Sequence, residues 1–127
     1  MKSDAVFLHH ILDAINRIEQ YLAGVSYDHF LQDALLQDGV VRQMEIIGEA
    51  ARNVSKGLQD AHPELPWDKM IGTRNILIHA YFRVDLFIVW DTTQSDLPRL
   101  KQQIEQLLEE IGENDGEASS QSTILDK

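Results

Sequence analysis

The chain has 127 residues, of which 43% are hydrophobic and 25% are charged, a composition typical of one soluble globular domain. It contains no cysteine, which excludes disulfides, thiol nucleophiles and thiolate zinc sites, and no apolar run approaches the roughly 20 residues that span a membrane. The formal net charge of -10 argues against a general nucleic-acid binder, because contacts to phosphate supply most non-specific affinity.

The N-terminal segment predicts a helix over residues 4–23, which Gly24 can end. Apolar side chains recur at steps of three and four residues, the spacing of one buried helical face. His9 and His10 fall in its second turn, and we interpret them as polar residues at the helix rim, since no further metal ligands lie at workable spacing. The histidines and charges inside the apolar pattern, and the lack of a small-residue cleavage site, indicate a helix of the mature fold and not a signal peptide. The absence of cysteine is compatible with the cytoplasmic location that we expect.

The next segment predicts a short helix over residues 28–36, broken at Asp38 and Gly39. Asp38 is then the expected N-cap of a third helix that runs to about Ser55. The predicted buried stripe of this third helix consists of Val40, Val41, Met44, Ile47, Ala51 and Val54.

Small residues on the third helix, at Gly48, Ala50 and Ala51, allow another helix to approach closely. Two interpretations of Glu49 beside them stay open. It can reach the arginine of the approaching helix and so support a functional site, or it can form a simple surface ion pair within its own helix.

Residues 58–66 contain two prolines and predict a loop with room for one helical turn. Pro66 then marks the start of a fourth helix over residues 67–80, because proline fits the entrance of a helix. Asp85 can cap the last helix, in which Pro98 predicts a kink or break near residues 94–97.

Taken together, these patterns predict an all-α antiparallel bundle of about five helices over residues 1–112, with Gly112 ending the last helix. Residues 113–127 are polar, acidic and without period, so we predict a disordered tail. The last sixteen residues contain four acids and one base and therefore carry -3 of the net charge.

Eight residues, from Arg74 to Tyr81, bring together a guanidinium, an amide, an imidazole and a phenol. On a continuous helix, at about 100° per residue, Arg74 and Tyr81 nearly eclipse, whereas Asn75 and His79 share a neighbouring face. Arg74 and His79 lie about 140° apart, so they can flank a groove but do not stack. They converge better if the helix ends near His79 or if two copies of it meet across a symmetry axis.

Arginine binds phosphate bidentately and stabilises negative charge, and histidine moves protons near neutral pH. Arg74 and His79 together would suffice for metal-independent RNA cleavage, in which the ribose 2′-oxygen attacks the adjacent phosphorus, and Asn75 could fix the imidazole. The alternative is a structural hydrogen-bonded pair of arginine and histidine. Residues 69–83 contain three bases and no acid, a locally basic segment in an acidic chain.

The sequence resembles the HEPN superfamily, specifically the HepT-like toxins of the formerly uncharacterised DUF86 type, over roughly residues 4–111. Residues 74–81, RNILIHAY, match the family pattern RX4HXY. Flanking matches follow in order: Ile46-Ile47-Gly48-Glu49-Ala50-Ala51, Pro66-Trp67, Tyr81-Phe82, Val84-Asp85, Ile88-Val89-Trp90 and Asp96-Leu97-Pro98. Ala80 stands where glycine is common, and Thr73 where a bulkier apolar residue is common.

The resemblance implies a helical bundle that dimerises so that two motifs face one cleft. Arg74 and His79 would be the ribonuclease residues, supported by Asn75 and Glu49, with no metal or other cofactor. Tyr81 would accept AMP from an MntA-like nucleotidyltransferase antitoxin, the neutralising step of a type VII toxin–antitoxin system. Two basic segments in one dimer cleft would also make a local positive site for RNA on an acidic protein.

Two rival hypotheses remain beside the toxin ribonuclease. The chain could be a non-catalytic helical partner that only binds and positions a nucleotidyltransferase. It could also be a structural dimer with a buried Arg–His pair. Loss of RNA cleavage in variants of Arg74 and His79 would distinguish a catalytic role from both rival hypotheses.

Overall fold

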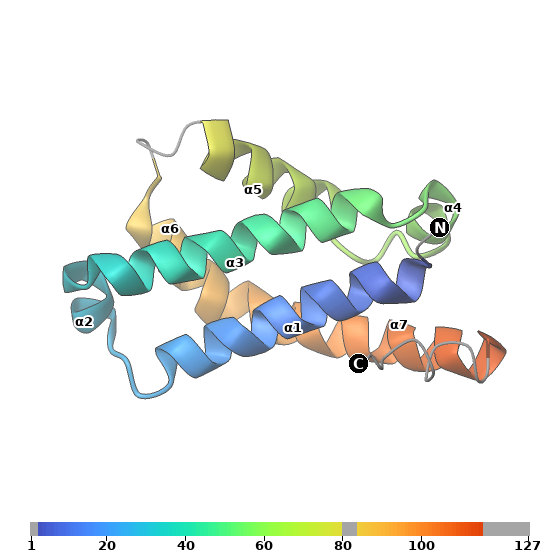
Figure 1. Ribbon diagram of the computed structural model, residues 1–127, viewed down its shortest axis with the longest axis horizontal. Coiled ribbons are helices and arrows are strands. Elements are labelled where there is room, and N and C mark those ends of the chain that lie inside the picture. Colours follow the sequence, from blue (N-terminus) through green and yellow to red (C-terminus); the bar gives the residue numbers. More distant parts are fainter. Residues whose placement is uncertain (1–2, 80–83, 116–127) are drawn as a thin grey trace.

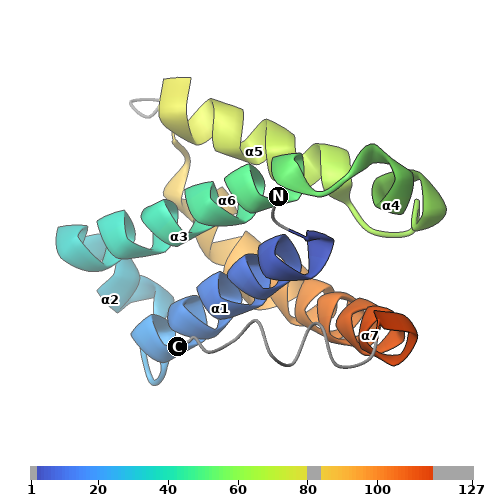
Figure 2. The ribbon, with the colours of Figure 1, turned by 45° about the vertical axis from the view of Figure 1, so that its right-hand side comes forward.

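Four long helices form the bundle in the computed structural model, which describes residues 3–79 and 84–115, with side chains through residue 112. They are α1 (Asp4–Leu22), α3 (Ala34–Asn53), α5 (Trp67–His79) and α7 (Leu97–Asp115). Figures 1 and 2 show neighbouring long helices running antiparallel in the order α5, α3, α1, α7. No strand occurs in the described ranges, and the predicted all-α antiparallel bundle is confirmed. None of the described helices is long and apolar enough to cross a bilayer.

Short elements connect the long helices. They are α2 (Tyr27–Gln32), α4 (Lys56–Ala61), α6 (Leu86–Asp91) and the π-helix η2 (Thr92–Asp96). Helices α2 and α4 begin at serine caps, since Ser26 Oγ accepts from the His29 N–H at 3.1 Å and Ser55 Oγ accepts from the Leu58 N–H at 3.2 Å. Helix α4 occupies part of the segment that we predicted as a loop with one turn.

One continuous core joins the long helices, and the predicted apolar stripes supply most of it. The fully buried side chains of large volume are Leu8, Ile11, Ile15, Ile18, Phe30, Val40, Ile104 and Leu107. Trp67 anchors the start of α5, because its ring is buried and its Nε1–H donates to the His62 carbonyl at 2.9 Å. This anchor positions the helix that carries the RX4HXY motif.

The break predicted at Asp38 and Gly39 is wrong, because α3 begins earlier and runs through both residues. Asp33 is the actual cap: its Oδ1 accepts from the Leu36 N–H at 3.0 Å, and this backbone hydrogen bond lowers the pKa of the carboxyl below its usual value. A glycine inside a helix costs only about 1 kcal/mol. At Gly39 the Tyr21 ring packs against the helix, and its nearest atom lies 3.4 Å from where a Cβ would stand.

The C-terminal predictions are confirmed at two points and wrong at one. Asp85 caps α6, since its Oδ1 accepts from the Phe87 N–H at 2.9 Å. The predicted break appears as η2, which ends two residues before Pro98, a residue with no N–H to continue the helical ladder. Helix α7 continues past Gly112 to Asp115, because Ile111 still packs against the core. The remaining tail, residues 116–127, lies outside the described residues.

Candidate functional site

A close approach between α3 and α5 places the candidate site. Gly48 makes this possible, because a Cβ added there would lie 2.2 Å from the Arg74 Cβ and 2.7 Å from the Met70 carbonyl oxygen. Both are atoms of the α5 backbone or directly attached to it, so they cannot move unless the helix moves. The prediction that a small surface on the third helix receives another helix is confirmed.

The guanidinium of Arg74 is held from two sides. Its Nη2 lies 3.2 Å from Glu49 Oε1 on α3, and its Nη1 donates to Asn75 Oδ1 at 3.1 Å. Glu49 is itself fixed by Asn53, whose Nδ2 donates to Glu49 Oε2 at 3.3 Å. The predicted contact between Glu49 and an arginine of another helix is therefore present. Asn75 contacts the arginine, and not the imidazole that we expected it to fix.

Arg74 is still able to bind an anion. Its side chain is 21% exposed, and the two contacts leave further N–H donors on Nη1 and Nη2. Its Nε is buried and has no hydrogen-bond partner among the residues that the structure describes. Buried polar atoms without partners are uncommon in native structures and often belong to functional sites. The Arg74 guanidinium is thus fixed in position, but only some of its N–H donors have acceptors.

A surface groove of about 300 Å³ opens over this guanidinium. Its middle is one face of α3, its α5 side carries Arg74 and Ile78, and its α1 side carries Phe7 and His10. The sequence did not connect the two α1 residues with Arg74. The only available signal was their spacing of three residues, which places them on one helical face.

His79 is the last residue of α5, and its side chain is exposed. Among the described residues it makes no hydrogen bond or ion pair, so no Arg–His pair forms there, and a structural pair across a dimer stays a hypothesis. It does not line the groove over Arg74. The described part of α5 runs to His79, and residues 80–83 lie outside the described residues, so the expectation that the helix ends near His79 stays a prediction. Tyr81 is one of them.

The predicted basic segment is less basic in space than along the chain. Lys69 Nζ lies 3.0 Å from Asp96 Oδ2 in η2, and Arg74 pairs with Glu49. Each of these two bases thus has a carboxylate from another element beside it, while the third base, Arg83, lies outside the described residues. An incoming phosphate must compete with Glu49 for Arg74. In the described part of the chain, no three histidine, aspartate or glutamate side chains gather closely enough to hold a metal ion.

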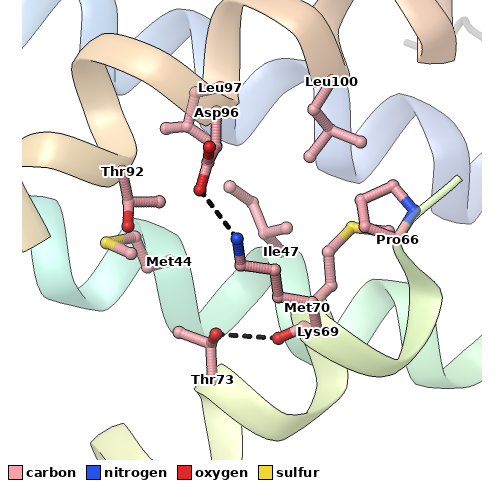
Figure 3. Close-up of a pocket in the computed structure, with 10 residues that line it drawn as sticks. All are labelled: Met44, Ile47, Pro66, Lys69, Met70, Thr73, Thr92, Asp96, Leu97 and Leu100. Atoms are coloured by element: carbon pink, nitrogen blue, oxygen red, sulfur yellow. Dashed lines mark hydrogen bonds and ion pairs between the residues drawn. The ribbon is translucent and has the colours of Figure 1, made fainter. Parts of the chain in front are cut away.

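The Lys69–Asp96 pair lies across a second, smaller pocket behind α5, of about 70 Å³ (Figure 3). Its lining is mostly apolar and comes from α3, α5, η2 and α7, with Met44, Ile47, Met70 and Leu97 among the residues. Thr73 stands at its edge, and its Oγ1 donates to the Lys69 carbonyl at 2.7 Å (Figure 3). The helix of the motif is therefore packed densely against Gly48 but loosely on this side.

Known proteins share the sequence over most of this chain. A family described as "Ribonuclease HepT-like" matches residues 11–107. A protein of Thermococcus cleftensis named "Probable ribonuclease HepT" is 41% identical over 106 residues, which cover 84% of this chain and 96% of that protein. The chain belongs to the HepT-like ribonuclease family. This membership makes ribonuclease the enzymatic class of the chain.

Two further relatives extend the family. A protein of Caldanaerobacter subterraneus subsp. tengcongensis, named as a "Putative RNase", is 36% identical over 86% of this chain and 97% of its own length. A Methanocaldococcus jannaschii protein, whose name couples a gamma-glutamylcyclotransferase with a "putative RNase", is 38% identical over 90% of this chain. The match covers 52% of that relative, so this chain spans about half of its length. No solved structure matches the chain.

The small pocket gives a first prediction, on stability. Thr73 lines this pocket, and the pocket has space that a bulkier apolar side chain would fill. We expect Thr73→Leu to raise the free energy of unfolding by about 1 kcal/mol, since filling a cavity typically adds about 0.5–2 kcal/mol. Thermal unfolding should show a melting temperature higher by about 5 °C. The control Thr73→Ser should not raise it, and an unchanged or lower value for Thr73→Leu would contradict the expectation.

Proposed function

We propose that this HepT-like chain is an endoribonuclease that cleaves RNA without a metal ion, with Arg74 and His79 as its catalytic residues. One observation carries the proposal: Glu49 and Asn75 hold the Arg74 guanidinium in an open groove, and an exposed histidine follows five residues later. A fixed guanidinium stabilises developing charge without reorganising during the reaction.

The chemistry is an internal transfer of the phosphoryl group. The ribose 2′-oxygen attacks the adjacent phosphorus while His79 takes its proton, and Arg74 stabilises the charge that develops on the phosphoryl oxygens. The bond to the 5′-oxygen of the next nucleotide breaks, and that oxygen takes up a proton. The products are a 2′,3′-cyclic phosphate and a 5′-hydroxyl end. When the substrate binds, its phosphate replaces Glu49 at part of the Arg74 guanidinium.

A homodimer would complete this site. Arg74 and His79 point about 140° apart on one helix, so a single subunit does not bring them onto one phosphate easily. Helix α5 also exposes two apolar residues, Ile76 at 59% and Ile78 at 38%. Burial of such residues against a second copy of α5 would favour association, and it would place two motifs at one cleft.

Tyr81 is the proposed switch of a toxin–antitoxin pair. Its phenol oxygen would attack the α-phosphorus of ATP, held by an MntA-like nucleotidyltransferase, and pyrophosphate would leave. The attached adenylate would add negative charge seven residues along the chain from Arg74, the residue proposed to bind the RNA phosphate.

The prediction for this switch is a mass change. Incubation of the chain with the transferase and ATP should add one or more AMP units to its intact mass and abolish RNA cleavage. Tyr81→Phe should show no added mass and should stay active in the presence of the transferase. Persistence of the added mass in Tyr81→Phe would rule out Tyr81 as the acceptor.

One experiment distinguishes the ribonuclease from the alternative function, a non-catalytic partner of a nucleotidyltransferase. Wild-type protein is incubated in EDTA with a labelled single-stranded RNA, and its binding to the transferase is measured in parallel. Cleavage in EDTA supports the ribonuclease. Transferase binding without any RNA cleavage, at protein concentrations where dimers form, supports the alternative.

A further inference from the structure

Phe7 and His10 form a wall of the groove opposite Arg74, on a different helix. Their rings meet edge to face, with centroids 5.9 Å apart and planes at 88°. Phe7 is half-buried and also packs against the core, so the pair is anchored from below, while His10 is exposed at the groove. An anchored aromatic ring beside an accessible imidazole is a common way for proteins to stack on a nucleobase.

Small and apolar residues of α3 form the floor of the groove between the two walls. Ala50, a small buried residue, lies between the α1 wall and Arg74, and Ile46 lies one turn before it on the same face of α3. Glu49 and Asn53 complete this face, but Asn53 Nδ2 donates to Glu49, and Glu49 pairs with Arg74. The floor therefore offers an apolar surface rather than free polar groups.

The acidic and basic side chains that line the groove are balanced, because each lining carboxylate has a basic partner. Glu49 lies beside Arg74, and Glu45 Oε1 lies 3.3 Å from Arg42 Nη1. His10 differs from two other histidines of the chain, His29 and His62, which contact carboxylates at 3.3 and 3.2 Å. Within the described residues, no carboxylate or other hydrogen-bonding group occupies its ring nitrogens.

We propose that Phe7 and His10 are substrate-binding residues, which hold the base of a nucleotide next to the scissile phosphate while Arg74 holds the phosphate. This inference rests on the proposed ribonuclease function and adds the part of the chain that positions the RNA strand. The strand crosses α3 above Ala50, from α5 to α1. The histidine at the helix rim thereby acquires a role that its position in the sequence did not indicate.

The test uses a fluorescein-labelled single-stranded RNA of mixed sequence and the full chain. Binding is measured in a His79→Ala background, which should not cleave, and KM and kcat are measured with His79 intact. We expect His10→Ala and Phe7→Leu each to weaken RNA binding about tenfold, with the loss appearing in KM and not in kcat. Phe7→Leu keeps an apolar side chain in the core contact but removes the ring.

His9→Ala is the matched control, since it changes the same residue type one position away and outside the groove lining. It should bind RNA like the wild type, and thermal unfolding should confirm that all variants fold. If wild-type protein cleaves RNA but His10→Ala and Phe7→Leu retain its affinity and KM, the inference is overturned and the ribonuclease function stands. If His10→Ala lowers kcat alone, the role in binding is also overturned. If the wild type neither binds nor cleaves RNA, the proposed function itself fails.

Discussion

Replacing His79 by alanine is expected to reduce the rate of RNA cleavage by about 10²–10⁴-fold, the usual contribution of a positioned acid or base. Arg74→Ala should reduce it by about 10²–10³-fold, the usual contribution of one fixed donor to a developing negative charge. Arg74→Lys should not restore the rate, because an ammonium group cannot bind phosphate through a planar fork. Initial rates on one labelled RNA in EDTA measure all three variants.

Both alanine variants should fold, so the loss would report on chemistry. His79 is exposed at the end of α5, and its removal leaves no cavity. Without Arg74, Glu49 keeps the contact with Asn53 at 3.3 Å and lies 3.9 Å from Arg52. Arg99→Ala on α7 is a control for the loss of one positive charge, and it should cleave like the wild type. Wild-type rates in both His79→Ala and Arg74→Ala would contradict the assignment.

Gly48→Ala is expected to be the most disruptive substitution of a single methyl group in the described structure. The new Cβ would stand 2.2 Å from the Arg74 Cβ, so α5 has to move away from α3. Overpacking typically costs about 1–3 kcal/mol, and we expect the upper end here because the overlap is with backbone and Cβ atoms. Alanine regains about 1 kcal/mol through its helix propensity, which leaves a net cost of about 2 kcal/mol. We expect a lower melting temperature, by about 5–10 °C, and a fall in cleavage of about 100-fold as the guanidinium shifts.

Gly72→Ala supplies the matched control on α5. A Cβ at this position meets nothing within 4 Å, so the same chemical change should be neutral or slightly stabilising and should leave cleavage unchanged. Thermal unfolding and initial rates measured on the two variants side by side give the comparison. Equal stability and activity of Gly48→Ala and Gly72→Ala would contradict the role assigned to the close approach of α3 and α5.

Most of the fold was predictable because helical periodicity is a local property of the sequence. The apolar stripes of α1, α3 and α7 gave the long helices, and Pro98 indicated the break that became η2. The errors came from positions where tertiary contacts override local preference. Gly39 and Gly112 looked like helix ends, yet one lies against the Tyr21 ring and the other follows Ile111, which packs on the core.

The site was predictable to a lesser extent. The motif named Arg74 and His79, and the small surface around Gly48 indicated that Glu49 meets an arginine. Partners that come from other helices were not predictable from spacing. The sequence did not show that Asp96 neutralises Lys69, nor that His10 shares a groove with Arg74. Three helices have to be placed in space before these side chains can be related.

The central claim is cleavage of RNA through its own 2′-hydroxyl group, and the substrate itself provides the most direct test. An RNA that the wild-type protein cuts in EDTA is mapped to one cleavage site, and the nucleotide on its 5′ side is then replaced by its 2′-O-methyl counterpart. The account predicts that the unmodified RNA yields a 2′,3′-cyclic phosphate end and that the modified RNA is not cut at that position. Cutting of the modified RNA at an undiminished rate, or a 3′-hydroxyl end on the product, would contradict it.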